Sequence, residues 1–401
     1  MRMFEYKKIG LLTACFIAFN CYLLTAQIIT GAQQINAYLP LLNGKKVGLI
    51  VNQTSVINGT HLVDSLQKLG VSITAIFAPE HGFRGDHSAG AKVKSVTDEK
   101  TGLPVISLYG KNYKPSAEAL SKVDVMIFDI QDVGARFYTY ISTLHYAMEA
   151  CAENNKQMIV LDRPNPNGFY VDGPVLDMKY KSFVGMHPVP IVHGLTVGEY
   201  AGMINGQKWL KDSARCNLTV IPMQGYDHNM KYILPVKPSP NLPSTESIAL
   251  YPSLCLFEGT TYSLGRGTDM PFECVGKPGC KVGSYYFTPK NISGVAENPP
   301  QMNKECRGYV LTPFARYELQ KEPRIHLKLM IDLYRADTAQ SRFFIDFINK
   351  LAGNDRFQQQ IKAGLSETEI RRSWQPGIES YLAYRKNYLL YTDASLIYTK
   401  P

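Results

Sequence analysis

The chain has 401 residues, of which 45% are hydrophobic and 19% are charged, and its formal net charge is +9. This composition is typical of a globular protein, and the length exceeds what one hydrophobic core usually serves, so we expect two domains. The basic excess is modest and contains no dense block of lysine or arginine. It is therefore compatible with an anionic substrate and is not the footprint of a nucleic-acid-binding protein.

The first 26 residues have the form of a signal peptide. Three basic residues precede a largely apolar stretch, 9–26, which ends in the small residue Ala26. We expect cleavage near Ala26 and export to the periplasm or the cell exterior, which lowers the formal charge from +9 to +7. Lipid anchoring through Cys15 ranks below simple cleavage, because the apolar stretch before it is short. No other stretch approaches the roughly 20 apolar residues of a membrane span.

From residue 44 to about 222, strand patterns alternate with helical patterns. The predicted strands are 46–51, 71–77, 104–109, 124–130, 157–161 and 217–221, and the predicted helices are 60–69, 117–120, 140–154 and 196–210. This alternation predicts an α/β fold with a Rossmann-like, doubly wound and mainly parallel sheet. Neither a G-x-G-x-x-G fingerprint nor a P-loop is present, so the fold does not imply a bound nucleotide.

The proline-rich stretch 235–243 is the natural domain boundary. It predicts a Rossmann-like domain over 27–235 and a smaller α+β C-terminal domain over 236–401. In that second domain we expect an amphipathic helix over 343–351, a helix opened by a capping box that starts at Ser366, and a terminal helix over 377–390.

Six cysteines follow the predicted cleavage site. Cys274, Cys280 and Cys306 cluster in a region rich in glycine and proline, where an oxidising compartment permits a disulfide, most simply between Cys274 and Cys280. Cys151 and Cys255 lie in apolar contexts and read as core thiols. The spacing of the cysteines does not match a zinc site.

Polar side chains follow the predicted strands, where open α/β sheets bind ligands. They are Glu80, His81 and Arg84; Asp129, Gln131, Asp132, Arg136 and Tyr138; Asp162, Arg163 and Asn165; His193 and Glu199; and, after the boundary, Glu258 and Arg266. If they converge, several carboxylates lie beside several arginines, a set that suits glycoside hydrolysis. Asp129 and Glu199 read better as structural residues, and Asp162 is equally well explained as the ion-pair partner of Arg163.

A metal site is an alternative interpretation of the first of these loops. Glu80, His81, Asp86 and His87 lie close together in the sequence. Their spacing does not match the histidine–glutamate motifs of zinc hydrolases, so we assign no metal ligands. A serine nucleophile has less support, since no G-x-S-x-G motif is present.

The motifs together resemble the NamZ-type exo-β-N-acetylmuramidase family. The resemblance rests on the segments 79–85, 129–140, 161–168, 193–199, 257–260 and 265–268, in this order and over essentially the whole mature chain. It implies a Rossmann-like domain with a smaller C-terminal domain and a site between them. It also implies an exo-acting glycosidase that needs no cofactor and releases β-linked N-acetylmuramic acid from non-reducing ends of peptidoglycan fragments.

The resemblance also suggests roles for individual residues. Glu80 is the expected principal catalytic carboxylate, with Asp132 as the second and Asp162 as its substitute. The lactyl carboxylate of the sugar is best bound by a guanidinium, which is planar and donates two parallel hydrogen bonds. The candidates are Arg84, Arg136, Arg163 and Arg266. The candidates for the remaining contacts with the sugar are His81, Tyr138, Asn165, His193 and Glu258. The stereochemical course stays open.

Two other functions remain as alternatives. One is a metal-dependent amidase or esterase acting on cell-wall fragments. The other is a muropeptide-binding protein without catalysis. A cleft rich in carboxylates argues against binding alone, because buried acids are costly unless they are paired or used.

Overall fold

The structure, a computed structural model, describes residues 28–80, 82–84, 96–110, 112–319, 321–393 and 397–398. The predicted signal peptide, Cys15, His81, Asp86 and His87 lie outside the described residues. Within the described ranges, no helix has the length and apolar character needed to cross a membrane.

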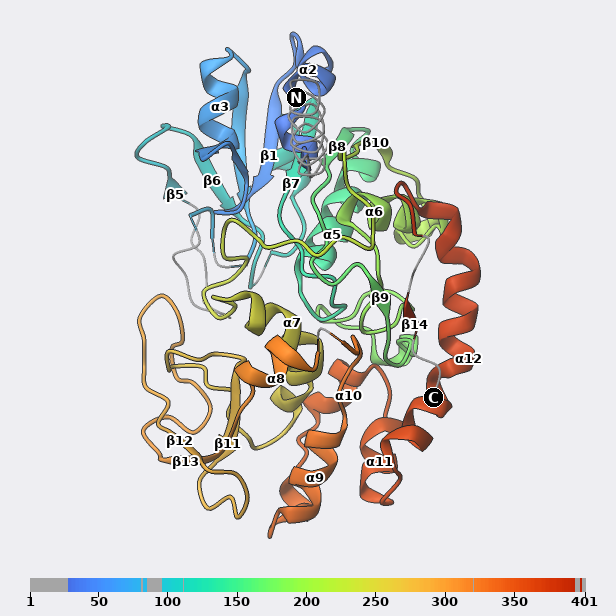
Figure 1. Cartoon of the computed structure of the whole chain (residues 1–401). Helices are drawn as coiled ribbons and strands as arrows, with labels where there is room; N and C mark the ends of the chain where they lie inside the picture. The colour runs from blue at the N-terminus through green and yellow to red at the C-terminus, as the bar shows by residue number, and fades with distance from the viewer. Residues whose placement is uncertain are drawn as a thin grey trace, which may run out of the picture.

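A central sheet organises the N-terminal part of the molecule (Figure 1). Its order over the described residues is β10-β8-β7-β1-β4-β6-β5, and all neighbours are parallel except β5 and β6. The strands are β1 (Val47–Val51), β4 (Ile73–Ala78), β5 (Val96–Thr97), β6 (Pro104–Ser107), β7 (Val125–Asp129), β8 (Gln157–Leu161) and β10 (Asn217–Ile221). The predicted α/β class with a mainly parallel sheet is confirmed.

Both faces of this sheet are covered, because its strands are apolar on both sides. Leu49 of β1 packs in one buried cluster with Leu66, whereas its neighbour Ile50 belongs to a second cluster that contains Met148. The helices on the sheet are α3 (Leu62–Lys68), α4 (Ala117–Leu120), α5 (Tyr140–Glu153) and α6 (Val197–Gly206). A short hairpin of β2 (Val56–Ile57) and β3 (Thr60–His61) precedes α3.

The C-terminal part is smaller and mixed, as predicted, with an antiparallel sheet of order β11-β13-β12. Its elements are α7 (Thr245–Leu254), β11 (Cys274–Lys277), β12 (Tyr285–Phe287), β13 (Cys306–Val310), α8 (Thr312–Tyr317), α9 (Lys328–Ala336), α10 (Phe347–Ala352), α11 (Arg356–Lys362) and α12 (Glu367–Arg385). The second cluster of the sheet continues into this part through Ile331 and Phe343. The two domains therefore share a core. The boundary at residue 235 stays a prediction.

The long helix α12 returns to the N-terminal domain and runs along the side of the molecule (Figure 1). Its Arg371 guanidinium lies 2.9 Å from the carboxylate of Asp172, and its Tyr381 hydroxyl donates to the carbonyl of His193 at 2.6 Å. A two-residue pairing of β9 (Tyr170–Val171) with β14 (Ile397–Tyr398) adds a further link. The end of the chain therefore braces the sheet domain.

The predicted division of the last helical region is wrong. Ser366 forms the expected capping box, but the helix that it opens continues through Pro376 to Arg385, so no separate helix begins at 377. A continuous apolar face holds the helix together across the proline, and it buries Ile370, Trp374, Ile378 and Tyr381. The other predicted helix, 343–351, is shorter than expected, because α10 begins only at Phe347.

The disulfide that the sequence permits between Cys274 and Cys280 is not formed. All six cysteines in the described part of the chain are free thiols. Cys274 of β11 packs in a small cluster with Phe287 of β12 and Cys306 of β13, whereas Cys280 belongs to the main core. The two thiols of the simplest permitted pairing therefore lie in different clusters.

Candidate active site

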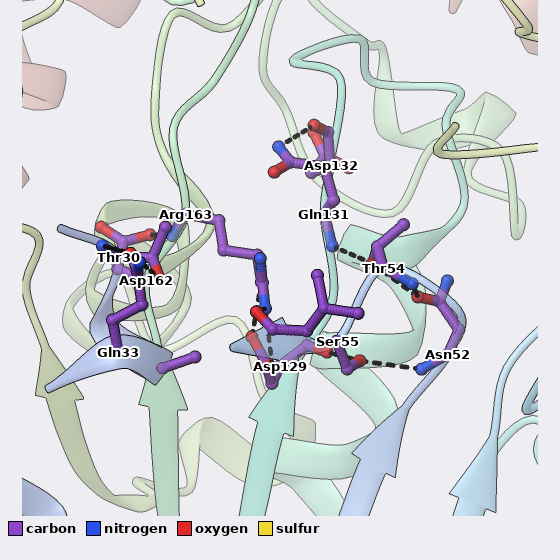
Figure 2. Close-up of polar contacts among 12 residues, drawn as sticks. Thr30, Gln33, Asn52, Thr54, Ser55, Asp129, Gln131, Asp132, Asp162 and Arg163 are labelled. Atoms are coloured by element: carbon purple, nitrogen blue, oxygen red, sulfur yellow. Dashed lines mark hydrogen bonds and ion pairs between the residues drawn. The ribbon is translucent and has the colours of Figure 1, made fainter. Parts of the chain in front are cut away.

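The strand ends of the parallel sheet meet at one edge, where a hydrogen-bonded network joins their loops (Figure 2). The Thr54 hydroxyl, after β1, donates to Asn52 Oδ1 at 2.6 Å and accepts from the backbone N–H of Gln131 at 3.0 Å. Gln131 in turn donates through Nε2 to the carbonyl of Pro164 at 2.6 Å. The loops after β1, β7 and β8 are therefore fixed relative to one another.

Two of the strand-end residues form a buried ion pair beneath this network. Asp129 and Arg163 contact each other through two bonds, Nε to Oδ1 at 2.5 Å and Nη2 to Oδ2 at 2.9 Å (Figure 2). Their exposed fractions are 0% and 5%. Asp129 is structural, as expected, because its carboxylate accepts two hydrogen bonds from the guanidinium of Arg163. The alternative pairing of Arg163 with Asp162 is wrong.

Asp162 is enclosed by other donors. Its carboxylate accepts from the Thr196 hydroxyl at 2.7 Å, the Gly198 N–H at 2.8 Å and the Tyr391 hydroxyl at 2.6 Å. Burial raises its pKa to about 6, although these hydrogen bonds oppose the shift. The C-terminal segment that carries Tyr391 covers Asp162, and the role of substitute catalytic carboxylate has no geometric support.

Asp132 is also buried, in the loop after β7. Its Oδ2 accepts from the Gly134 N–H at 2.6 Å and lies 3.9 Å from Nε2 of His193. Burial raises the pKa of Asp132 to about 7, and burial followed by the charge of Arg385 lowers that of His193 to about 3. Asp132 is therefore buried beside a neutral histidine, and it is not among the lining residues of the pocket described next.

A pocket of about 460 Å³ lies between the two domains. The N-terminal domain contributes a wall that contains Glu80 and residues of the loop before α5, and the C-terminal domain contributes the facing residues. The principal polar and aromatic lining residues are Glu80, Tyr109, Tyr138, Thr139, Tyr140, Phe183, Asn241, Tyr251, Glu258, Tyr262, Arg266 and Glu297. Three of them, Glu80, Glu258 and Glu297, are carboxylates.

Glu80 enters the pocket directly after strand β4. Its carboxylate is half-buried and accepts from the Thr139 hydroxyl at 2.8 Å. The nearby Tyr109 has its pKa raised, first by burial and then by the charge of Glu80. Glu80 thus combines access to a ligand with a fixed orientation, as a catalytic acid requires.

The second charged group of the pocket is the pair of Arg266 and Glu258. Arg266 donates from Nε and Nη2 to one oxygen, Oε1, at 2.9 and 2.6 Å, and its guanidinium lies 4.8 Å from the ring centre of Phe272. Their side chains keep 20% and 27% of their surface exposed. Arg266 is therefore oriented by Glu258 and remains accessible to an anion.

The other predicted arginines have structural partners. Arg84 is exposed and forms an ion pair with Asp98 at 2.9 Å. Arg136 is completely buried and donates to the carbonyls of Pro174, Val189 and Leu351. Arg163 pairs with Asp129, as described above. Of the four arginines proposed for the lactyl carboxylate, the structure brings only Arg266 into the pocket.

The remaining predicted sugar contacts divide in the same way. Tyr138 lines the pocket, although its hydroxyl already donates to the carbonyl of Pro238 at 2.8 Å. Asn165 is buried and donates to the carbonyl of Leu195 at 2.8 Å. His193 accepts the Leu195 N–H, is buried and is not among the lining residues of the pocket. His81 lies outside the described residues.

Sequence reasoning missed several lining residues, among them Tyr109, Thr139, Asn241, Tyr251 and Tyr262. A signal for two of them was available. Thr139 lies inside the aromatic motif after β7, and Tyr109 follows β6 at the same edge of the sheet. The C-terminal residues had no such signal, because no strand pattern places them.

Metal ligands do not cluster in the part of the chain that the structure describes. No group of three or more His, Cys, Asp or Glu side chains there could hold a metal ion. Of the four residues of the metal hypothesis, only Glu80 is described, and its partner is a hydroxyl.

Two family models match nearly all of the described chain. The model described as "Exo-beta-N-acetylmuramidase NamZ, N-terminal" matches residues 47–246, and its C-terminal counterpart matches residues 249–391. The chain belongs to the NamZ exo-β-N-acetylmuramidase family. The residues that line both walls of the pocket fall inside the matched ranges.

Individual relatives agree with this assignment. The chain is 41% identical over 380 residues to the peptidoglycan beta-N-acetylmuramidase NamZ of Bacillus subtilis (strain 168), and the match covers 88% of this chain and 89% of that protein. It also matches crystal structures of two DUF1343 family proteins from Bacteroides fragilis. One has a TM-score of 0.85 and 47% identity, covering 92% of this chain and all of the other. The second has a TM-score of 0.75 and 30% identity, covering 91% and 99%.

Proposed function

We propose that this protein is an exo-acting glycoside hydrolase that releases β-linked N-acetylmuramic acid from the non-reducing ends of peptidoglycan fragments. Membership of the NamZ family and the name of the Bacillus subtilis relative support the activity. The structural observation that carries the proposal is the position of Glu80, a carboxylate held by a hydroxyl in a pocket that also presents an accessible arginine.

Glu80 is the proposed general acid. It protonates the glycosidic oxygen as the bond to the anomeric carbon breaks, and a water molecule completes the hydrolysis at that carbon. The Thr139 hydroxyl fixes the carboxyl group in the apolar wall formed by the aromatic residues. The other carboxylates of the pocket are Glu258 and Glu297, so assistance at the anomeric carbon comes from one of them or from the acetamido group of the substrate. The role of Asp132 as the second catalytic carboxylate stays a prediction without geometric support.

Arg266 is the proposed partner of the lactyl carboxylate, the group that distinguishes N-acetylmuramic acid from N-acetylglucosamine. Glu258 holds the guanidinium through one carboxylate oxygen, Oε1. The guanidinium keeps further N–H groups for a planar anion. A pocket enclosed by both domains suits the end of a glycan better than its middle, which favours exo action.

Turnover of chromogenic glycosides tests this proposal. We expect the wild-type protein to release p-nitrophenol from p-nitrophenyl β-N-acetylmuramide and much less from the β-N-acetylglucosaminide. Prior treatment with a chelator should leave the rate unchanged. Loss of activity with the chelator and its recovery with zinc would instead favour a metal-dependent hydrolase, and binding of the muramide without turnover would favour a binding protein.

We also propose that the protein acts outside the cytoplasm, because its N-terminal sequence has the pattern of a signal peptide. The mass of the protein recovered from the producing cell tests this. Cleavage near Ala26 is the expected result, whereas an intact N-terminus or a lipid attached to Cys15 would contradict it.

A further inference from the structure

Four aromatic rings form a continuous cluster at the edge of the pocket, which we call the aromatic rim: Tyr109, Tyr113, Tyr146 and Phe183. The ring centre of Tyr113 lies 4.1 Å from that of Phe183 and 6.2 Å from that of Tyr146, on which it stacks. The ring of Tyr109 contacts those of Tyr113 and Phe183 edge-on, with 5.9 and 6.1 Å between the ring centres. Tyr109 and Tyr113 come from the loop after β6, Tyr146 from α5, and Phe183 from the loop after residue 180.

The aromatic rim is not part of either large hydrophobic core of the described residues, and each of its four side chains is only partly buried. It is nevertheless held in place. Lys114, next to Tyr113, binds Glu149 at 2.9 Å and Glu153 at 2.6 Å, both on α5. The Ser142 hydroxyl of α5 donates to the carbonyl of Phe183 at 2.7 Å. A fixed and partly exposed aromatic surface is a common feature of binding sites.

The aromatic rim is continuous with the catalytic pocket. Tyr109 and Phe183 line the pocket together with Glu80, whereas Tyr113 and Tyr146 do not. The rim therefore extends the wall that carries Glu80 beyond the pocket. The charged pair of Arg266 and Glu258 belongs to the other domain.

We infer that the aromatic rim binds the sugar on the leaving-group side of the scissile bond, the neutral N-acetylglucosamine unit of the glycan. This inference rests on the proposed function. A general acid at Glu80 lies next to the leaving oxygen, so the leaving sugar lies along the wall that continues from Glu80. The C–H face of a pyranose packs on aromatic rings, and tyrosine hydroxyls at the ring edges meet its polar groups.

The stem peptide is a less suitable occupant of the same surface. It extends from the lactyl group, which the proposed function places at Arg266 on the other domain. Lys114, which follows Tyr113 of the rim in the sequence, is already paired with two carboxylates.

Two substrates that share the muramic acid but differ in the leaving group test the inference. The first is the disaccharide of N-acetylmuramic acid β-linked to N-acetylglucosamine, and the second is β-N-acetylmuramyl fluoride, whose leaving group is too small to reach the rim. For Tyr113→Ala and, separately, Tyr146→Ala, we expect kcat/KM for the disaccharide to fall about tenfold more than kcat/KM for the fluoride. Tyr317→Ala, a tyrosine on α8 that is 66% exposed, is the matched control and should change neither.

Equal losses on both substrates would overturn the inference, because a merely structural role for the rim affects every substrate alike. No loss on either substrate would also overturn it, because the rim would then make no contact that contributes to turnover. A wild-type protein that hydrolyses neither substrate would remove the proposed function and, with it, this inference. Normal hydrolysis by the wild type with no change in the ratio for either variant would remove the inference alone.

Discussion

Two pairs of acidic residues make an instructive comparison. Asp129 and Asp162 lie at the carboxyl ends of neighbouring strands of the sheet, and both are completely buried and hydrogen-bonded. Glu80 and Glu258 line the pocket and are only partly buried. Asp129, Asp162 and Glu80 all lie at the same edge of the sheet, where ligands bind in folds of this class.

The difference lies in what covers each carboxylate. Arg163 lies against Asp129, and the C-terminal segment with Tyr391 lies against Asp162, so no substrate reaches either group. Glu80, by contrast, lines the pocket and is only partly buried. A carboxylate at a strand end therefore becomes a catalytic candidate when the rest of the chain leaves it accessible, and a structural residue when the chain seals it.

The largest expected effect comes from removing the acid of Glu80. We expect Glu80→Gln to lower kcat on the muramide by about a thousandfold, within the range of a lost general acid, without lowering the melting temperature. The amide keeps an acceptor for the Thr139 hydroxyl, so the local structure is preserved. Glu318→Gln, an exposed side chain on the C-terminal surface, is the control. Retained activity in Glu80→Gln would exclude Glu80 from the chemistry.

For the buried ion pair of Asp129 and Arg163, we expect a substitution to lower stability. We expect Arg163→Met to lower the free energy of unfolding by about 3–5 kcal/mol, because Asp129 would keep a buried charge without a partner. Denaturant titration measures this loss. The double variant Asp129→Asn/Arg163→Met, which removes both charges, should recover part of it. A stable Arg163→Met with reduced affinity for the muramide would instead return Arg163 to the substrate contacts.

The comparison also shows what the sequence could predict. Strand and helix periodicity reports burial within each element, so the parallel sheet was predictable. The same reasoning selected Glu80 and Arg266, which stand in conspicuous motifs and which line the pocket. It could not exclude Asp162 as a catalytic carboxylate, because the segment that seals Asp162 is more than 200 residues away along the chain. It could not predict Arg136 as a core residue either, since its partners are backbone carbonyls of three distant segments.

A third experiment concerns Asp132, which is buried without a cationic partner in the described part of the chain. Burial raises the pKa of Asp132 from its ordinary 3.8 to about 7, so the folded state keeps a proton that the unfolded state releases. The free energy of unfolding should therefore decrease as the pH rises from about 4 to 7, by at most about 4 kcal/mol from this group. The Asp132→Asn variant has no carboxyl group at this position, so this pH-dependent decrease in the free energy of unfolding is absent. Its stability relative to the wild type should increase over that pH range, and an unchanged difference between pH 4 and 8 would contradict the burial argument.

A smaller effect is expected at the anion contact. We expect Arg266→Ala to lower kcat/KM for the muramide by about thirtyfold, equivalent to about 2 kcal/mol for a charged hydrogen bond, and to raise the inhibition constant of free N-acetylmuramic acid similarly. Arg84→Ala is the matched control, because Arg84 is exposed and paired with Asp98 outside the pocket. If Arg84→Ala rather than Arg266→Ala weakens binding, the lactyl group lies elsewhere.

The smallest effect tests the segment that seals Asp162. The Tyr391 hydroxyl donates to Asp162 at 2.6 Å and accepts the N–H of Met223 at 2.8 Å, so Tyr391→Phe removes two hydrogen bonds and leaves the other donors of Asp162 in place. We expect a loss of about 1–2 kcal/mol in the free energy of unfolding and no change in kcat per folded molecule. Tyr286→Phe, with a side chain that is 55% exposed, controls for the substitution itself. A variant with unchanged stability but impaired turnover would make Asp162 a functional carboxylate, and covering by the chain would then no longer separate the two kinds of strand-end acid.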